Sequence, residues 1–361
     1  IPDYSKEKLL IDADIKGPGK AVGPYFDETP LKDSLGATLQ ELQLDGDVNA
    51  RLHLDIPLNG ELVTAKGEVT LRNNSLFIKP LDSTLKNLSG KFSFINGDLQ
   101  SEPLTASWFN QPLNVDFSTK EGAKAYQVAV NLNGNWQPAK TGVLPEAVNE
   151  ALNGSVAWDG KVGIELPYHA GATYNVELNG DLKNVSSHLP SPLAKPAGEP
   201  LPVNVKVDGN LNSFELTGQA GADNHFNSRW LLGQKLTLDR AIWAADSKTL
   251  PPLPEQSGVE LNMPPMNGAE WLALFQKGAA ESVGGAASFP QHITLRTPML
   301  ALGNQQWNNL SIVSQPTANG TQVEAQGREI NATLAMRNNA PWLANIKYLY
   351  YNPSVAKTRG D

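Results

Sequence analysis

The sequence contains no cysteine, and this absence excludes several chemistries at once. None of the 361 residues can form a disulfide, act as a thiolate nucleophile or bind a metal through a cysteine thiolate. The five histidines are isolated, and no HxH or HxxxH pair places two imidazole ligands on one face. We therefore expect no metal site and no cofactor.

Positive charge is scarce as well. Lys and Arg together number 29 against 37 Asp and Glu, which gives a formal net charge of −8. Proteins that bind nucleic acids need a positive field to hold the phosphates. We therefore expect no nucleic-acid partner.

Long apolar runs are also missing. No stretch approaches the roughly 18 residues of a membrane span, and no charged start followed by an apolar stretch marks a signal peptide. The chain begins at Ile1 rather than at Met and stops in the polar residues TRGD. We expect a fragment of a longer protein, with any anchor or export signal in the missing part.

Candidate catalytic residues are few. Asp45 and Asp47 share one face of a predicted strand, as alternate strand residues must, and a carboxylate pair at a defined separation could serve a carbohydrate-active enzyme. A charged outer face is the competing interpretation, and His53 lies on the same polar face. The segment GPGKAVG (17–23) lacks the spacing of a phosphate-binding loop. We predict no catalytic residues and a protein that is not an enzyme.

The feature that the sequence does contain is long alternation of apolar and polar residues. The stretch LQLDGDVNARLHLDIPL (42–58) alternates throughout, with Gly46 in phase on the apolar side. Strict alternation is typical of a strand with one buried and one wet face. A two-residue hairpin turn at Asp45-Gly46 would put Val48 out of phase, so we predict one strand bent at Gly46. Its 17 residues would extend to about 56 Å.

The same kind of strand recurs along the chain. Similar segments are IPLNGEL (56–62), VNLNGNW (130–136), VELNGDL (176–182) and VKVDGNL (205–211). Period-2 counting predicts roughly twenty strands, one pair of which we expect to flank a turn at Asn73-Asn74. Their uneven spacing argues against a repeat of fixed length.

Few helices are predicted, and all of them are short. Pro145 to Leu152 has apolar residues four apart, and Asn267 could cap a helix that carries Trp271, Leu274 and Phe275 on one face. A third candidate runs from Thr29 to Gly36, and the proline-rich stretch 189–202 is predicted to be a loop.

One-faced strands need something to cover their apolar side, and two architectures can provide it. In a sandwich, two sheets cover each other. In a curved open sheet, the apolar face lines a groove that a ligand fills. Composition favours the sandwich, whereas the length of the strands favours the groove.

One segment carries a family resemblance. Gly67 to Leu113 resembles the repeated unit of AsmA-like proteins, with NLSG (87–90) and GDL (97–99) in the expected order and QPL (111–113) at the last turn. Asn110 stands where the family has Gly. The segments 152–168 and 186–209 resemble one branch of that family. The match covers about Leu42 to Leu238 and is weak after Leu250.

The resemblance implies a fold and a function. AsmA-like proteins are similar to bridge-like lipid transfer proteins, in which a long, curved, predominantly antiparallel sheet forms a U-shaped hydrophobic groove. It implies a periplasm-spanning protein anchored in the inner membrane of a Gram-negative bacterium, which conducts phospholipid to the outer membrane and supports its barrier. Possible membrane partners would contact missing parts of the chain. The alternative is a closed-core periplasmic structural or interaction protein without a lipid conduit.

On this basis we predict a mainly β fold in four segments and a set of residues that line the groove. The segments are a first segment with a short helix (1–41), a groove segment (42–188), a proline-rich link with continued groove (189–250) and a further β segment with one short helix (251–361). The residues predicted to contact acyl chains are Leu52, Leu54, Val69, Leu71, Phe92, Phe94, Trp108, Val115, Phe117, Val130, Val156, Trp158, Val162, Ile164, Val176 and Val205.

Overall fold

The computed structural model describes residues 7–21, 42–279 and 287–352, and its residues fall into two compact units. Unit 1 comprises Ile1–Val143 and Ala157–Leu178, and unit 2 comprises Leu144–Val156 and Asn179–Asp361. The prediction of a mainly β fold with a mostly antiparallel sheet and few helices is confirmed. The predicted helix from Thr29 to Gly36 lies outside the described residues.

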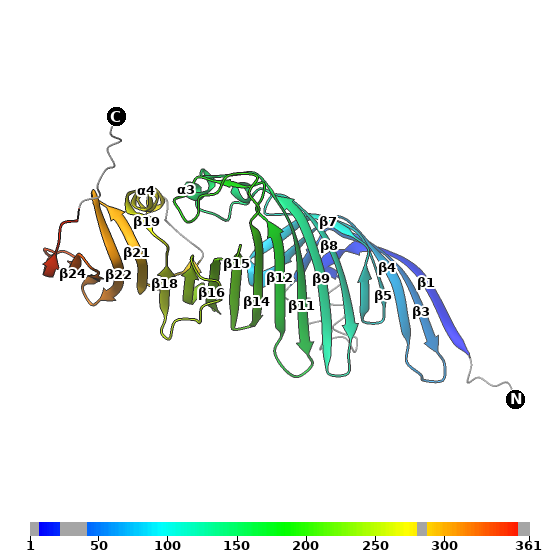
Figure 1. The fold of residues 1–361 in the computed structure, drawn as a ribbon. Coiled ribbons are helices and arrows are strands. Elements are labelled where there is room, and N and C mark those ends of the chain that lie inside the picture. The colour runs from blue at the N-terminus through cyan, green and yellow to red at the C-terminus, as the bar shows by residue number, and fades with distance from the viewer. Residues whose placement is uncertain (1–6, 22–41, 280–286, 353–361) are drawn as a thin grey trace. The chain divides into compact units, whose positions relative to one another are not determined.

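Unit 1 is an antiparallel sheet whose strands lie side by side in Figure 1. Its strands are β1 (Lys8–Pro18), β2 (Leu42–Asp45), β3 (Asp47–Pro57), β4 (Thr64–Ile78), β5 (Ser83–Ile95), β6 (Asp98–Ser101), β7 (Leu104–Trp108), β8 (Gln111–Glu121), β9 (Ala125–Trp136), β11 (Val156–Pro167) and β12 (Thr173–Asp181), with the short 3-10 helices η2 (Gly19–Ala21), η4 (Lys79–Leu81) and η5 (Pro138–Lys140). The pairing runs from β1 through β3, β4 and β5 to β6 and β7, which both lie along β5, and then to β8, β9 and β11.

The long strand predicted for 42–58 is confirmed. β2 and β3 both pair with β4, and only Gly46, with φ of +93°, separates them. The predicted turn at Asn73-Asn74 is wrong, because β4 continues through both residues and its register to β5 shifts there. Asn73 has φ of +52°. Asn tolerates the left-handed conformation in a β-bulge as well as in a turn, so the dipeptide alone does not separate the two.

The irregular points of neighbouring strands fall on one line, which we call the crease. It passes Gly46 between β2 and β3, Asn74 in β4 and the stretch 86–90 of β5. A cluster of buried apolar residues lies along it: Val48, Leu71, Leu85, Leu88, Leu104, Ala106 and Leu113. Side chains from both sides of the crease, such as Leu76 and Phe92, pack against this cluster. The sheet of unit 1 is therefore concave on its apolar side.

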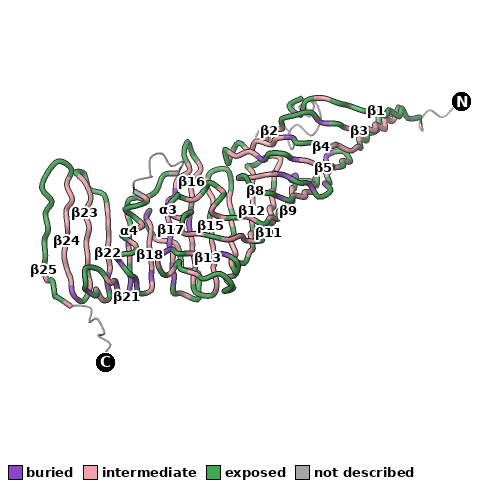
Figure 2. The backbone as a smooth tube through the Cα atoms, turned by 90° about the horizontal axis from the view of Figure 1, so that it is seen from above, coloured by how far each residue is buried: buried purple, intermediate pink, exposed green. Residues whose placement is uncertain are grey.

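Away from the crease, most residues in the strands of unit 1 are intermediate or exposed rather than buried. β9 and β12 alternate between intermediate and exposed residues along most of their length, and Figure 2 shows this alternation with buried positions confined to short stretches. A sheet packed face to face against a second sheet would bury its inner side chains fully. The burial pattern is that of a single layer.

Unit 2 combines antiparallel and parallel pairing. Its strands are β10 (Leu152–Asn153), β13 (Ser186–Ser187), β14 (Pro202–Asn210), β15 (Ser213–Ala220), β16 (Asn224–Leu232), β17 (Leu236–Ala244), β18 (Gly258–Asn262), β19 (Met266–Asn267), β20 (Ala287–Ser288), β21 (Ile293–Leu302), β22 (Gln305–Thr317), β23 (Gly320–Gln326), β24 (Ile330–Arg337) and β25 (Leu343–Leu349). β14 to β17 and β21 to β25 form two antiparallel series. Parallel pairing of β17 with β18 and of β18 with β21 joins the two series.

The predicted helices are confirmed in part. α4 (Gly268–Ala279) begins after Asn267, whose Oδ1 accepts hydrogen bonds from the next turn at 3.1 and 3.3 Å. Trp271 packs against an apolar cluster of unit 2. Its ring centroid lies 6.1 Å from that of Phe275, so the two residues share a face of the helix as predicted, although Phe275 is 66% exposed. α3 (Glu146–Asn149) is shorter than predicted. Neither α3 nor α4, nor any other helix among the described residues, is long and apolar enough to cross a bilayer.

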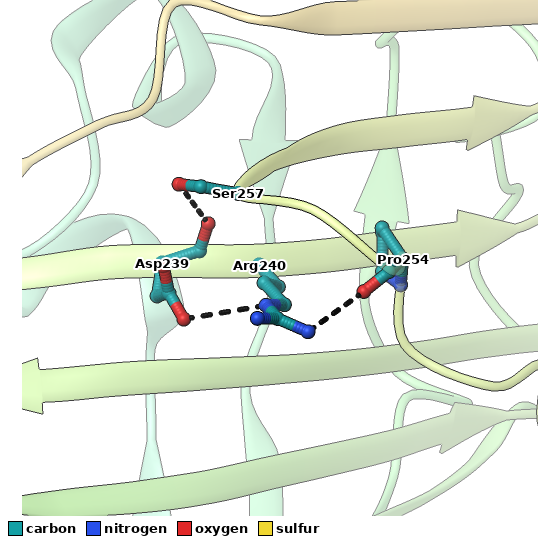
Figure 3. Close-up of polar contacts among 4 residues, drawn as sticks. All are labelled: Asp239, Arg240, Pro254 and Ser257. Carbon is teal, nitrogen blue, oxygen red and sulfur yellow. Dashed lines mark hydrogen bonds and ion pairs between the residues drawn. The ribbon is translucent and has the colours of Figure 1, made fainter.

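A proline-rich segment, residues 246–257, crosses the polar face of β16 and β17, and we call it the strap. Asn227 of β16 donates a hydrogen bond to the Pro251 carbonyl at 3.0 Å. In Figure 3, Arg240 of β17 donates to the Pro254 carbonyl at 3.2 Å and forms an ion pair with Asp239 at 3.5 Å. Ser257 Oγ donates to the Asp239 carbonyl at 2.9 Å. The strap is therefore held along its length by side chains of two strands.

Candidate functional site

The apolar face of unit 1 is built from rows of cross-strand neighbours. Opposed residues of an antiparallel pair point to the same face. One row runs from Ala50 through Val69 to Phe92, and the next runs from Leu52 through Gly67 to Phe94. The long strands thus place predicted lining residues of β3, β4 and β5 next to one another.

Gly67 allows close packing within the second row. A Cβ atom at this position would lie 2.8 Å from the ring of Phe94 and closer still to the backbone of β3. The Phe94 ring therefore covers the space that a side chain would fill. Leu54, one row farther from the crease, faces Ala65 of β4 and continues the apolar face along β3.

The face continues across β8 and β9. Val115 lies opposite Leu132, and Phe117 lies opposite Val130. The rings of Phe92 and Phe117 have centroids 5.6 Å apart, so the apolar rows are continuous from β5 to β8.

β11 and β12 extend the same face. A Cβ atom at Gly160 would contact both Trp158 and Leu178, which sets the alignment of β11 with β12 and places these residues on one face. Val156, Val162 and Ile164 are in phase with Trp158, and Val176 is in phase with Leu178.

Unit 2 has its own apolar face. Val205 lies opposite Gly218, which lies opposite Phe226. Phe214 and Trp230, which lie opposite each other on β15 and β16, stack on this face with ring centroids 6.0 Å apart. Near α4 this apolar character becomes a closed cluster of buried residues: Ala245, Met263, Met266, Leu300 and Leu310.

Fifteen of the sixteen predicted lining residues have the same degree of burial, and Leu71 is the exception. Leu71, in the crease, is 4% exposed. The other fifteen are intermediate, neither buried nor fully exposed. A closed sandwich would bury such residues in its core, whereas a concave single layer leaves them partly open to an occupant. The burial pattern therefore fits the open-groove alternative better than the sandwich.

The opposite face of unit 1 is polar and cross-linked. His53 Nδ1 lies 2.5 Å from Asp12 Oδ1, and Lys91 forms an ion pair with Glu68 at 3.4 Å. Asn114, the neighbour of Val115, donates to Asn133 Oδ1 at 2.9 Å. Exposed ion pairs of this kind contribute little stability, but they keep this face hydrated. The same strands thus have one apolar face and one polar, hydrated face.

Four aromatic residues meet at one edge of the apolar face of unit 1. Trp108 ends β7, Phe109 follows it in the turn, Trp136 ends β9 and Trp158 is near the start of β11. The closest ring pairs are Trp108 with Phe109 at 4.8 Å and Trp136 with Trp158 at 5.0 Å. The period-2 pattern of the sequence predicts Trp108 and Trp158 as lining residues but not the other two. The phase of Leu132 and Trp136 could have revealed Trp136, whereas Phe109 sits in a left-handed turn position outside any phase.

Several residues of the crease were also missed. Leu85 and Leu88 are three apart, yet both are buried on the apolar side, because β5 is irregular between Lys86 and Ser89. A bulge adds one residue to a strand and reverses its phase. Alternation alone therefore does not assign both residues to one face.

Tyr126 and Glu329 are among the described groups with shifted pKa values, and both are held by hydrogen bonds. Burial raises the pKa of Tyr126, which is fully buried and donates to the Gly97 carbonyl at 2.8 Å, to about 12. Burial alone would raise the pKa of Glu329, but hydrogen bonds from Asn308 and Asn352 outweigh it and lower the pKa. Across residues 7–21, 42–279 and 287–352, no three His, Asp or Glu side chains converge as metal ligands would.

Comparison with known proteins identifies the family. The family model described as YhdP protein matches residues 1–361. The chain is 98% identical over all 361 residues to a protein of Escherichia coli (strain K12) named intermembrane phospholipid transporter YhdP, and it spans 28% of that protein's length. No solved structure matches the chain. The expected resemblance is confirmed, and the chain belongs to the YhdP family.

Proposed function

We propose that this chain is part of a conduit that carries phospholipid between the inner and outer membranes. The observation that carries the proposal is the burial of the predicted lining residues, fifteen of which remain half-exposed, most of them on the concave single-layer face of unit 1. The name of the Escherichia coli relative, an intermembrane phospholipid transporter, supports the same cargo.

The physical basis is burial of acyl chains against a continuous apolar surface. Each CH₂ group removed from water contributes about 0.8 kcal/mol. Rows such as Ala50–Val69–Phe92 offer similar contacts at successive positions, so a chain that slides along the face exchanges one contact for an equivalent one. Movement then needs neither a deep binding site nor a chemical step, and any driving force is external.

The remaining predictions follow from this proposal. The protein acts as a carrier and not as an enzyme, and it works in the periplasm of a Gram-negative bacterium as part of a longer chain anchored in the inner membrane. The segments 42–188, 189–250 and 251–361 all contribute to the conduit, after a first segment, 1–41. The support is the relative's name, which places its activity between membranes.

A matched pair of substitutions tests the proposed conduit. Val115 is half-buried on the apolar face, and its neighbour Asn114 is exposed on the polar face. Val115→Asp places a charge in the path of the acyl chains, so the chain should lose co-purifying phospholipid and keep its cooperative unfolding. Asn114→Asp adds the same charge to the outer face and should retain lipid. Loss of folding in Val115→Asp, with an unchanged control, would instead identify this position as closed core.

The alternative function is that of a structural or interaction protein with a closed core. The buried cluster beneath α4, which includes Met263, Met266 and Leu300, favours it locally in unit 2. A lipophilic fluorophore distinguishes the two functions, because an open apolar face takes it up in the native state. A closed core binds it only after partial unfolding.

A further inference from the structure

The four aromatic residues at the edge of the apolar face of unit 1, Trp108, Phe109, Trp136 and Trp158, form a continuous group that we call the aromatic rim. Trp136 contacts Trp108, Phe109 and Trp158, with ring centroids 6.3, 6.2 and 5.0 Å apart. All four are half-buried and lie at or beside strand ends. The rim therefore lies where the apolar face meets water.

Burial decreases along β7 from the crease to the rim. Leu104 is 2% exposed, Ala106 is 9% exposed and Trp108, at the end of the strand, is half-buried. Protein side chains already fill the crease, so a lipid on this face would lay its acyl chains past the crease, over half-exposed residues such as Phe92 and Phe117. Its polar end would then lie at the level of the rim.

The indole N–H groups of the rim differ in their partners. Trp108 donates to Ser83 Oγ at 2.7 Å, and Trp136 donates to the Pro112 carbonyl at 2.6 Å. Trp158 Nε1 has no hydrogen-bond partner and is shielded from solvent. Buried indole N–H groups usually find an acceptor, so the Trp158 donor is an unsatisfied exception among the residues that the structure describes.

Indole rings suit a boundary of this kind. Tryptophan combines a large apolar ring with one polar N–H, and it gathers where hydrocarbon meets lipid headgroups. The ester carbonyls of a phospholipid lie at that boundary and accept hydrogen bonds. Because the Trp158 N–H is shielded from solvent, its ring must turn outward for the N–H to reach such an acceptor.

We propose that the aromatic rim binds the glycerol-ester region of a phospholipid whose acyl chains lie against the apolar face, with Trp158 donating to an ester carbonyl. The proposal rests on the proposed function, because it requires lipid on this face. It adds an orientation, with the polar end at the rim and the chains past the crease. It also adds a chemical preference for ester-linked lipids.

The first test is depth-dependent quenching of tryptophan fluorescence in the full chain. The chain is loaded with phosphatidylcholine that carries bromines on acyl carbons next to the ester or near the methyl end. Emission from Trp158 is isolated by comparison with Trp158→Phe, and Trp342→Phe, at an exposed position, is the control. We expect bromines next to the ester to cause the greater loss of Trp158 emission.

The second test removes the acceptor from the lipid. Wild-type chain should bind a diester phosphatidylcholine more tightly than its diether analogue with the same chains, and Trp158→Phe should abolish that difference. If Trp158 had a purely structural role, Trp158→Phe would weaken the binding of both lipids equally, and this result would overturn the proposal. Greater quenching from the methyl end would also overturn it while leaving the conduit intact. Absence of quenching by either lipid would refute the conduit itself.

Discussion

At the residue scale, the curvature of unit 1 depends on a buried amide. Asn74 is 1% exposed, and its Nδ2 donates to the carbonyls of Asp45 and Asp47 at 3.0 and 3.2 Å. Its Oδ1 accepts from the Arg72 N–H at 2.8 Å. A Cβ atom at Gly46 would lie 2.9 Å from Asn74 Nδ2. Asn74 thus satisfies the backbone where the long strand bends, and Gly46 makes room for it.

Replacing this amide should destabilise the crease. Asn74→Ala removes the two hydrogen bonds to the Asp45 and Asp47 carbonyls and the one from the Arg72 N–H, and the loss of each such bond costs about 1 kcal/mol. We expect the free energy of unfolding to fall by about 3 kcal/mol or more, measured by urea unfolding. Asn114→Ala, on the exposed face, is the control and should change stability by less than about 0.5 kcal/mol. Equal effects of the two substitutions would contradict this role.

The raised pKa of Tyr126 predicts that the folded protein loses stability at alkaline pH. Its folded-state pKa is about 12 because it is buried, against an ordinary value of 10.0. Below pH 10.0 the phenol is neutral in both states and its contribution to stability is complete. Between pH 10.0 and about 12 the unfolded chain ionises first, so this contribution, about 2.7 kcal/mol for a shift of two units, is progressively lost.

The variant Tyr126→Phe isolates this effect. The Gly97 carbonyl keeps a donor in the variant, because Thr119 Oγ1 also donates to it at 3.2 Å. We expect the free energy of unfolding to decrease less steeply in the variant than in wild type over this pH range, measured by urea unfolding at each pH. Parallel pH profiles for the two proteins would show that the buried phenol is not the cause.

Residue phase also explains what the sequence could predict. Leu52, Phe117 and Trp158 alternate regularly, and the structure places them on apolar faces because nothing interrupts the period of two. Asn73-Asn74 was mistaken for a turn because its left-handed preference serves a bulge equally well. A bulge depends on how its strand pairs with a strand distant in sequence, and the local sequence does not determine that pairing.

At the element scale, the strap covers part of the polar face of β16 and β17 in unit 2. Ile242, the cross-strand neighbour of Asn227, is 4% exposed, although it lies on a face that alternation would leave in water. The strap, which Asn227 and Arg240 hold, accounts for this burial. The only proline-rich loop predicted from the sequence was 189–202, and the strap was not predicted, because its place depends on contacts with strands distant in sequence.

The anchor of the strap can be tested by hydrogen exchange. Arg240→Ala removes the hydrogen bond to the Pro254 carbonyl and the ion pair with Asp239. The Arg240 side chain is 35% exposed, so solvent screens the ion pair and the expected loss of stability is only about 1 kcal/mol. Amides of 246–257 should exchange faster, while those of β14 and β15 should not change. Arg229→Ala, at the exposed cross-strand neighbour, is the control, and equal exchange in both variants would contradict the anchoring role.

The parallel pairing in unit 2 shows a further limit of prediction. β17, β18 and β21 are parallel neighbours, and α4 lies in the connection between β19 and β21. The periodicity predicted strands here and the cap at Asn267 predicted the helix. Neither contains information about strand direction, which is set by the crossover connection and its packing.

At the scale of the whole molecule, each unit presents an apolar face of its own. In unit 1 the face is concave around the crease, and in unit 2 it includes Val205 and the stacked pair Phe214 and Trp230. The fold class could be predicted because alternation repeats along the chain. An open rather than closed face could not be predicted from composition, because both architectures use the same one-faced strands.

The central claim, that lipid lies on this face, is tested most directly by photo-crosslinking in cells. A photoreactive residue would replace Val115 on the apolar face or Asn114 on the polar face of the same strand. Our account predicts that phospholipid is captured at Val115 and not at Asn114. Capture at neither position in a well-folded protein would contradict the account and favour a closed core.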